Sequence, residues 1–182
     1  MECGEPVSAT KAAKRDGLCL RCSGKRNPFF VLHSSLIDRV CRSPRGFDDL
    51  SDAEKLYFAL TLLQDEVNNG GFHQFFFNSS GAYYDLIESA LVTLDELTVL
   101  ELLRQAKQIV FPGVDVPVDS KTRRSSLCLP EPDSPQPEWA NKLDELDRRF
   151  YSTPNTLTGK LQEFARERGL VSAETNDKQA QN

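Results

Sequence analysis

The sequence predicts an all-α fold, in which a short cysteine-containing head precedes a compact multi-helix domain. Apolar residues recur at three- and four-residue spacing through most of the chain, as they do on the buried face of a helix. One aromatic-rich segment has the composition of a strand, but no partner strand appears elsewhere. The 182 residues are 39% hydrophobic and 27% charged, which provides apolar material for a core and excludes a wholly disordered chain.

Three parts are expected along the chain. A short basic head covers residues 1–27, an all-helical domain covers residues 28–171, and residues 172–182 are expected to be a disordered tail. No apolar run reaches the roughly 20 residues that a membrane span needs, and the first residues lack the pattern of a signal peptide. The five cysteines are an odd number without a secretory context, so we expect a protein of the reducing cytoplasm.

The first two helices of the domain have clear start and stop signals. Helical spacing of apolar residues begins at Pro28, and residues 43–46 interrupt it. Ser51 and Glu54 stand three residues apart, which is the pattern of a capping box at the start of the second helix. Residues 68–71 are Asn-Asn-Gly-Gly, and we expect them to end this helix because Asn and Gly accept the left-handed conformation of a C-cap.

The later elements are also predicted to be helical. The aromatic-rich segment 72–77 lies between helices and is expected to be a short helix itself. Residues 82–110 are predicted to form one or two helices, and residues 111–137 look like a long loop that ends in a proline-rich tract. Two amphipathic helices are expected after this loop, over residues 139–150 and 157–165.

Charge is distributed unevenly along the sequence. Residues 1–46 carry nine basic and four acidic residues, whereas residues 47–165 carry ten basic and twenty acidic residues. Residues 56–103 contain no Lys or Arg at all. An acidic surface repels nucleic acid and attracts basic partners, although a merely solubilising surface is the plainer interpretation.

Seven carboxylates of the cation-free stretch are candidate partner-binding residues. If residues 85–96 form one continuous helix, four of them lie within about 100° of one another, opposite an apolar face. Such a row resembles the phosphates along one DNA strand, so a basic DNA-binding protein could bind it. The acidic residues at 144–147 are weighted less, because Asp144 and Glu145 stand four residues before Arg148 and Arg149. The candidates are Asp65, Glu66 and Glu101, with Asp85, Glu88, Asp95 and Glu96 on the predicted row.

The head contains cysteines in a pattern that indicates zinc. Cys19 and Cys22 form a Cys-x-x-Cys knuckle, and Cys3 looks like the second half of another. A structural zinc site needs four ligands, and the missing one would precede the first residue. Either the chain begins too late, or the site is degenerate, or His33 or Cys41 substitutes. Zinc is the one cofactor that the sequence indicates, bound in a short zinc-ribbon-like module.

No catalytic residue is assigned from the sequence. His73 lies in the densest polar segment, and Ser79 or Ser80 could be drawn as a nucleophile with this histidine as base. The sequence has no nucleophile elbow, phosphate-binding loop or metal-binding histidine pair that would support such a catalytic pair. A small-ligand pocket or enzyme site within residues 68–81 is therefore kept as the alternative to a binding protein, and a zinc-module scaffold is a third interpretation.

Two apolar residues raise the question of a second chain. Phe58 and Leu62 lie away from the apolar face of the helix that begins after Ser51. They need cover from another helix or from another copy of the chain, so a homodimer is one expectation.

A family resemblance rests on residues 66–81, which read Glu-Val-Asn-Asn-Gly-Gly-Phe-His-Gln-Phe-Phe-Phe-Asn-Ser-Ser-Gly. This segment closely resembles the signature of the bacterial DNA-mimic protein family, residues 50–55 and 143–151 look like that family too, and the similarity covers about residues 30–170. The resemblance implies an all-helical fold, a dimer, and an acidic surface that occupies the DNA-binding face of a transcription factor or nucleoid protein. The signature residues are not the charges that would touch a partner, so we expect a structural role for Asn68, Asn69, Gly70, Gly71, Phe72, Gln74, Phe75, Asn78, Ser79, Ser80 and Gly81.

The predicted function is therefore that of a non-enzymatic acidic binding protein with a basic DNA-binding protein as its partner. Neither a membrane nor direct binding of nucleic acid by the acidic body is expected. The basic head departs from the pattern of a mimic, and the resemblance does not explain it.

Overall fold

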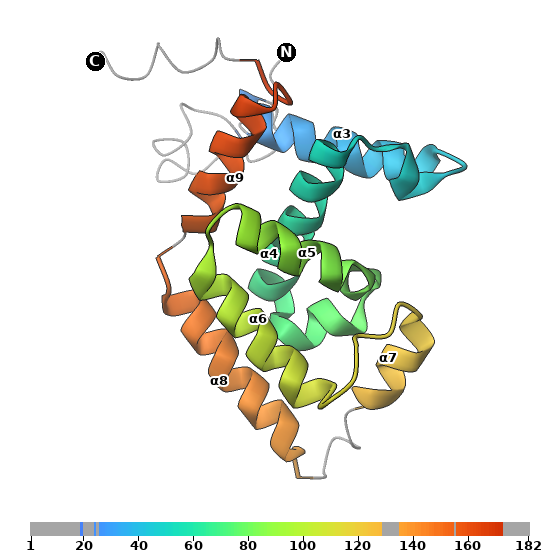
Figure 1. Ribbon diagram of the computed structural model, residues 1–182, viewed down its shortest axis with the longest axis vertical. Coiled ribbons are helices and arrows are strands. Elements are labelled where there is room, and N and C mark those ends of the chain that lie inside the picture. The colour runs from blue at the N-terminus through green and yellow to red at the C-terminus, as the bar shows by residue number, and fades with distance from the viewer. Residues whose placement is uncertain (1–18, 20–23, 25, 129–134, 155, 173–182) are drawn as a thin grey trace. The chain divides into compact units, whose positions relative to one another are not determined.

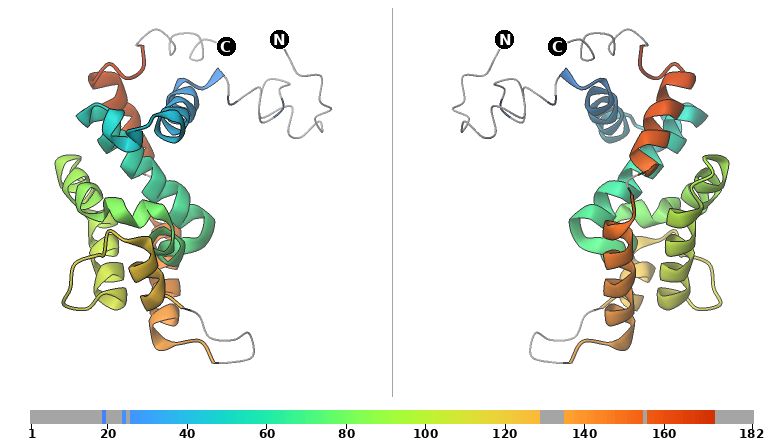
Figure 2. Two further views of the ribbon diagram at one scale, coloured as in Figure 1. Left: turned by 90° about the vertical axis from the view of Figure 1, so that its right-hand side faces the viewer. Right: turned by 90° about the vertical axis from the view of Figure 1, so that its left-hand side faces the viewer.

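Every regular element of the described chain is helical (Figure 1, Figure 2). The computed structural model describes residues 19, 24, 26–128, 135–154 and 156–172. The all-α prediction is confirmed for this part of the chain, whereas most of the expected zinc-ribbon-like module lies outside it. The elements are α3 (Pro28–Arg42), η1 (Gly46–Asp49), α4 (Asp52–Phe77), η2 (Ser79–Tyr83), α5 (Tyr84–Thr93), α6 (Leu97–Val110), α7 (Ser120–Ser126), α8 (Glu138–Ser152) and α9 (Thr156–Glu167).

Residue contacts divide the chain into two compact units. The first unit comprises residues 1–55 and 162–182, and the second comprises residues 56–161. The expected boundaries of the head and the tail stay predictions.

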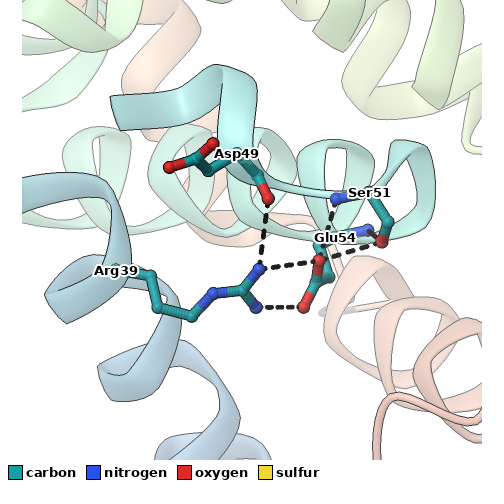
Figure 3. Close-up of polar contacts among 4 residues, drawn as sticks. All are labelled: Arg39, Asp49, Ser51 and Glu54. Atoms are coloured by element: carbon teal, nitrogen blue, oxygen red, sulfur yellow. Dashed lines mark hydrogen bonds and ion pairs between the residues drawn. The ribbon is translucent and has the colours of Figure 1, made fainter. Parts of the chain in front are cut away.

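The first unit is tied together at the predicted capping box (Figure 3). The Ser51 N–H donates to the Glu54 carboxylate at 2.8 Å, and the Glu54 N–H donates to Ser51 Oγ at 3.4 Å. The Arg39 guanidinium, which comes from α3, forms an ion pair with the same carboxylate and donates to the Asp49 carbonyl at 3.3 Å. Glu54 therefore has two roles: its carboxylate completes the capping box of α4, and it anchors α3 to the start of α4.

In the second unit, α4 is broken at the predicted Asn-Asn-Gly-Gly sequence. Gly71 has φ 72° and ψ −175°, a conformation that side chains with a Cβ rarely adopt. Residues 72–77 continue as helix, so the aromatic-rich segment is helical as predicted. The break lets Phe72, Phe75 and Phe76 turn into the core, where all three are fully buried.

The core of the second unit lies among α4, α5, α6 and α8. Helices α6 and α8 lie side by side (Figure 1), and α5 packs against α6. Phe58 of α4 is buried in the single chain and Leu62 is half-buried, so these two residues do not require a second copy as cover. Besides the three phenylalanines, the fully buried side chains include Leu60, Leu63, Ile87, Leu91 and Leu103.

Two later segments of the second unit compare differently with their expected structure. The one or two helices expected within residues 82–110 are two, α5 and α6, because the chain turns at Asp95, which has φ 52°. Residues 111–137 are not a loop throughout, because they contain α7. The Asp119 side chain caps this short helix by accepting the Thr122 N–H at 2.7 Å.

Candidate functional site

The signature segment is organised around the Glu66 carboxylate. Its Oε2 accepts hydrogen bonds from Gln74 Nε2 at 2.6 Å and from Asn78 Nδ2 at 2.9 Å, and its Oε1 accepts one from the buried Ser80 hydroxyl at 2.9 Å. Asn69 Nδ2 extends this network by donating to Gln74 Oε1 at 3.1 Å. The Glu66 oxygens are therefore used inside the fold, where Gln74, Asn78 and Ser80 bind them directly.

A second carboxylate, that of Asp147 on α8, caps the helical turn after the break in α4. Its Oδ1 accepts the Phe72 N–H at 2.8 Å. A Cβ placed on Gly71 would lie 2.0 Å from Asp147 Oδ2, so this close approach requires glycine. Burial raises the pKa of the Asp147 carboxyl above its ordinary value, and the hydrogen bond from Phe72 offsets only part of that rise.

The fully buried Arg123 of α7 is a structural residue that sequence reasoning missed. Its guanidinium donates to the Phe76 carbonyl at 2.9 Å, to the Asn78 carbonyl at 2.7 Å, and to both carbonyls of residues 117–118. These bonds satisfy carbonyls at the end of α4. A Cβ on Gly81 would lie 2.8 Å from Arg123 Nε, which accounts for that signature glycine.

His73 is packed as a structural residue. Its ring stacks with the rings of Phe77 and Trp139, whose centroids are 5.6 Å and 5.8 Å away. Its Nε2 lies 3.2 Å from the Leu127 carbonyl oxygen, and the Ser80 hydroxyl is bound to a carboxylate instead of to this histidine. The serine–histidine pair considered as an alternative is therefore not formed by Ser80, and the side chains of Gln74 and Asn78 are bound to the same carboxylate.

The predicted row of four carboxylates is not formed, because α5 and α6 are separate helices. Glu96 is 3% exposed, accepts the Thr156 hydroxyl at 2.9 Å, and forms an ion pair with Lys160 at 3.3 Å. Glu88 forms an ion pair with Arg104 at 2.7 Å. Both carboxylates are therefore neutralised inside the second unit, and the continuous stripe has to be corrected to a smaller set of charges.

Three of the predicted carboxylates are exposed on the hairpin that α5 and α6 form. Asp85 lies on α5, Asp95 in the turn, and Glu101 on α6. Within the described residues none of the three takes part in an ion pair, and Glu101 accepts a hydrogen bond from the neighbouring Gln105 at 2.7 Å. Asp65 is exposed on α4. We call Asp85, Asp95 and Glu101 the hairpin carboxylates.

The acidic residues of α8 pair differently from the expectation. Arg148 forms an ion pair with Glu145 at 2.6 Å rather than with Asp144, and Arg149 donates to Gln105 at 2.8 Å. The four-residue pairing is therefore wrong, because the neighbouring α6 attracts one of the two arginines.

The zinc prediction is not tested by the structure. Cys3 and Cys22 lie outside the described residues, and Cys19 is buried. The suggested substitutes His33 and Cys41 both lie on α3. Among the residues that the structure does describe, no three His, Cys, Asp or Glu side chains are grouped so that they could hold a metal ion.

The fold and the exposed carboxylates define a small all-helical domain with an acidic hairpin. Residues 48–168 match the model of the DMP19-like protein family, so the chain belongs to that family. This agrees with the resemblance to DNA-mimic proteins carried by residues 66–81. No curated protein and no solved structure matches the chain. None of the described helices is both long enough and apolar enough to cross a membrane.

Proposed function

We propose that this chain is a non-enzymatic binding protein whose acidic surface occupies the DNA-binding face of a basic protein, such as a transcription factor or nucleoid protein. The observation that carries the proposal is the set of hairpin carboxylates, which are exposed and without ion pairs in the described structure. Membership of the DMP19-like family supports the same function.

The charge of the second unit supports a cationic partner. Residues 56–161 hold fifteen acidic and nine basic residues. Because Glu88 and Glu96 are paired internally, the outward negative charge depends on the hairpin carboxylates and on exposed acids of other elements. Such a field attracts cationic surfaces over about 8 Å at physiological salt and weakens as salt rises.

Affinity capture with the full chain tests this proposal. The immobilised protein is exposed to nuclease-treated lysate of the organism that produces it, and the retained proteins are identified by mass spectrometry. We expect retention of one or two basic DNA-binding proteins at low salt and their release as salt rises, because the attraction is screened. Retention of no basic protein would contradict the proposal.

A matched pair of variants makes the test specific for the hairpin. Asp85→Asn, Asp95→Asn and Glu101→Gln together remove three charges, and asparagine tolerates the left-handed conformation at position 95. The control triple Asp115→Asn, Glu138→Gln and Glu145→Gln removes the same charge from exposed sites of other elements. We expect the hairpin triple to lose the partner and the control triple to keep it. Equal losses would mean that only net charge matters.

The homodimer implied by the family resemblance is part of the proposal. The burial of Phe58 within one chain removes one argument for a dimer but does not exclude it. Sedimentation of the full chain at two concentrations distinguishes the states, and a single monomeric species at both would contradict the dimer.

A further inference from the structure

The turn between α5 and α6 has a strained residue at its centre. The Asp95 N–H donates to the Val92 carbonyl at 3.0 Å, and the Glu96 N–H donates to the Leu91 carbonyl at 2.9 Å. These two bonds form a Schellman motif, in which glycine usually takes the left-handed position. Here Asp95 takes it with φ 52°, the one positive φ at a non-glycine residue in the described chain. Stability alone would favour glycine at this position.

The start of α9 holds this turn in place. Lys160 forms an ion pair with the buried Glu96 carboxylate at 3.3 Å and donates to the Asp95 carbonyl oxygen. Thr156 donates to the Glu96 carboxylate at 2.9 Å. These contacts use the backbone of Asp95 and the side chain of its neighbour, so the Asp95 carboxylate itself is left at the surface.

Two exposed apolar side chains flank that carboxylate along the chain. Val92 is 53% exposed at the end of α5, and Leu97 is 59% exposed at the start of α6. A single exposed apolar residue is ordinary, but two within three residues of the same exposed aspartate contribute nothing to solubility. We call Val92, Asp95 and Leu97 the corner patch.

We infer that the corner patch is the contact point for an arginine or lysine of the partner that is flanked by apolar side chains. The Asp95 carboxylate would accept the cationic head, while Val92 and Leu97 would pack against its aliphatic stem and the apolar neighbours. This inference rests on the proposed function and deepens it, because apolar contact is something that a DNA phosphate backbone does not offer. A mimic with such a patch selects one basic protein among many.

Charge complementarity favours this occupant over a second copy of the chain. Asp95 is the one charged member of the corner patch, and the neighbouring Lys160 is already paired with Glu96, so two corner patches placed face to face would bring like charges together. A cationic protein surface removes that repulsion.

Fluorescence anisotropy with two labelled helical peptides tests the inference on the full chain. The peptides have equal length and equal numbers of arginines, but one carries leucines beside the arginines where the other carries serines. We expect the wild type to bind the leucine peptide about tenfold more tightly, which corresponds to roughly 1.4 kcal/mol. The double variant Val92→Ser and Leu97→Ser should lose this preference but still bind both peptides in a salt-dependent way.

Two further variants complete the design. Val114→Ser with Val118→Ser removes two exposed valines from another part of the second unit and should keep the preference. Asp95→Gly should weaken the binding of both peptides about threefold, because the carboxylate is lost. It should also raise the melting temperature of the protein, because glycine adopts the left-handed conformation without strain.

Each remaining outcome overturns the inference in an identifiable way. If Val92→Ser with Leu97→Ser keeps the leucine preference, the corner patch is not the apolar contact, and the salt-dependent binding leaves the proposed function standing. If that variant turns a dimer into a monomer in sedimentation, the patch is an interface between copies. If the wild type binds neither peptide at low salt, both the inference and the proposed function fail.

Discussion

The Asp147 carboxylate of α8 accepts the Phe72 N–H of α4 at 2.8 Å, at the point where α4 breaks. This contact joins two of the segments on which the resemblance to the DNA-mimic family rests, residues 66–81 and 143–151. The two segments form one folding unit, in which one supplies the helix break and the other supplies its cap.

The contact predicts that Gly71→Ala is strongly destabilising. Gly71 has φ 72°, and an added Cβ would meet the Asp147 carboxylate at 2.0 Å. We expect a loss of about 2 kcal/mol or more in the free energy of unfolding, measured by urea denaturation. Gly159→Ala is the control: it lies in α9 with nothing within 4 Å of the added Cβ, so it should be neutral or slightly stabilising. A Gly71→Ala variant as stable as the wild type would contradict the account.

The same contact predicts how stability depends on pH. Burial raises the pKa of the Asp147 carboxyl above its ordinary value of 3.8, so the folded state binds this proton more tightly than the unfolded state does. Its contribution to stability is therefore full below pH 3.8 and is lost as pH rises through the folded pKa. Asp147→Asn keeps an oxygen for the Phe72 N–H but cannot ionise. We expect its stability relative to the wild type to increase from about pH 4 toward neutrality. A difference that does not change with pH would be incompatible with this.

The Glu54 carboxyl predicts the opposite pH dependence. Burial raises its pKa, but the hydrogen bonds from Arg39 and Ser51 outweigh burial and lower the pKa overall. Its contribution is therefore present above the unfolded pKa and is lost as pH falls through the folded one. Glu54→Gln should destabilise the protein more at neutral pH than in acid. Asp38→Asn, which breaks an exposed ion pair with Arg42, should have little effect at either pH.

The buried arginine predicts a cost for a conservative change. Arg123→Lys keeps the charge but cannot reproduce the planar set of bonds to the carbonyls at the end of α4. We expect thermal or urea unfolding to show a loss of about 2 kcal/mol or more, because carbonyls are left unsatisfied in the core. The neighbouring exposed Arg124, which donates to the Phe77 carbonyl at 3.0 Å, serves as the control, and Arg124→Lys should cost less. Equal effects would contradict the role of Arg123.

Much of the fold could be predicted from the sequence because its signals are local. The capping box at Ser51 and Glu54 and the glycine break after Asn69 depend on residues a few positions apart, and both are present as predicted. The turn at Asp95 was missed because it contains neither glycine nor proline, and its left-handed residue is held by a lysine from α9.

The candidate site was harder to predict because burial is decided by tertiary contacts. Asp65 and Glu66 are adjacent and chemically alike, yet Asp65 is exposed while Glu66 holds the signature segment together. Arg123 lies in a segment without an apolar pattern. The one local signal for a helix there is Asp119, a residue type that commonly caps helix N-termini. The sequence shows where the acidic residues are, and packing decides which of them are exposed.

Competition with DNA tests the central claim most directly. A labelled duplex is bound to the DNA-binding protein that affinity capture retains, and the full chain is added while anisotropy reports the bound DNA. We predict that the chain releases the DNA, that higher salt weakens the effect, and that Asp85→Asn with Asp95→Asn and Glu101→Gln abolishes it while the control triple does not. A ternary complex, in which the chain binds while the DNA stays bound, would contradict mimicry.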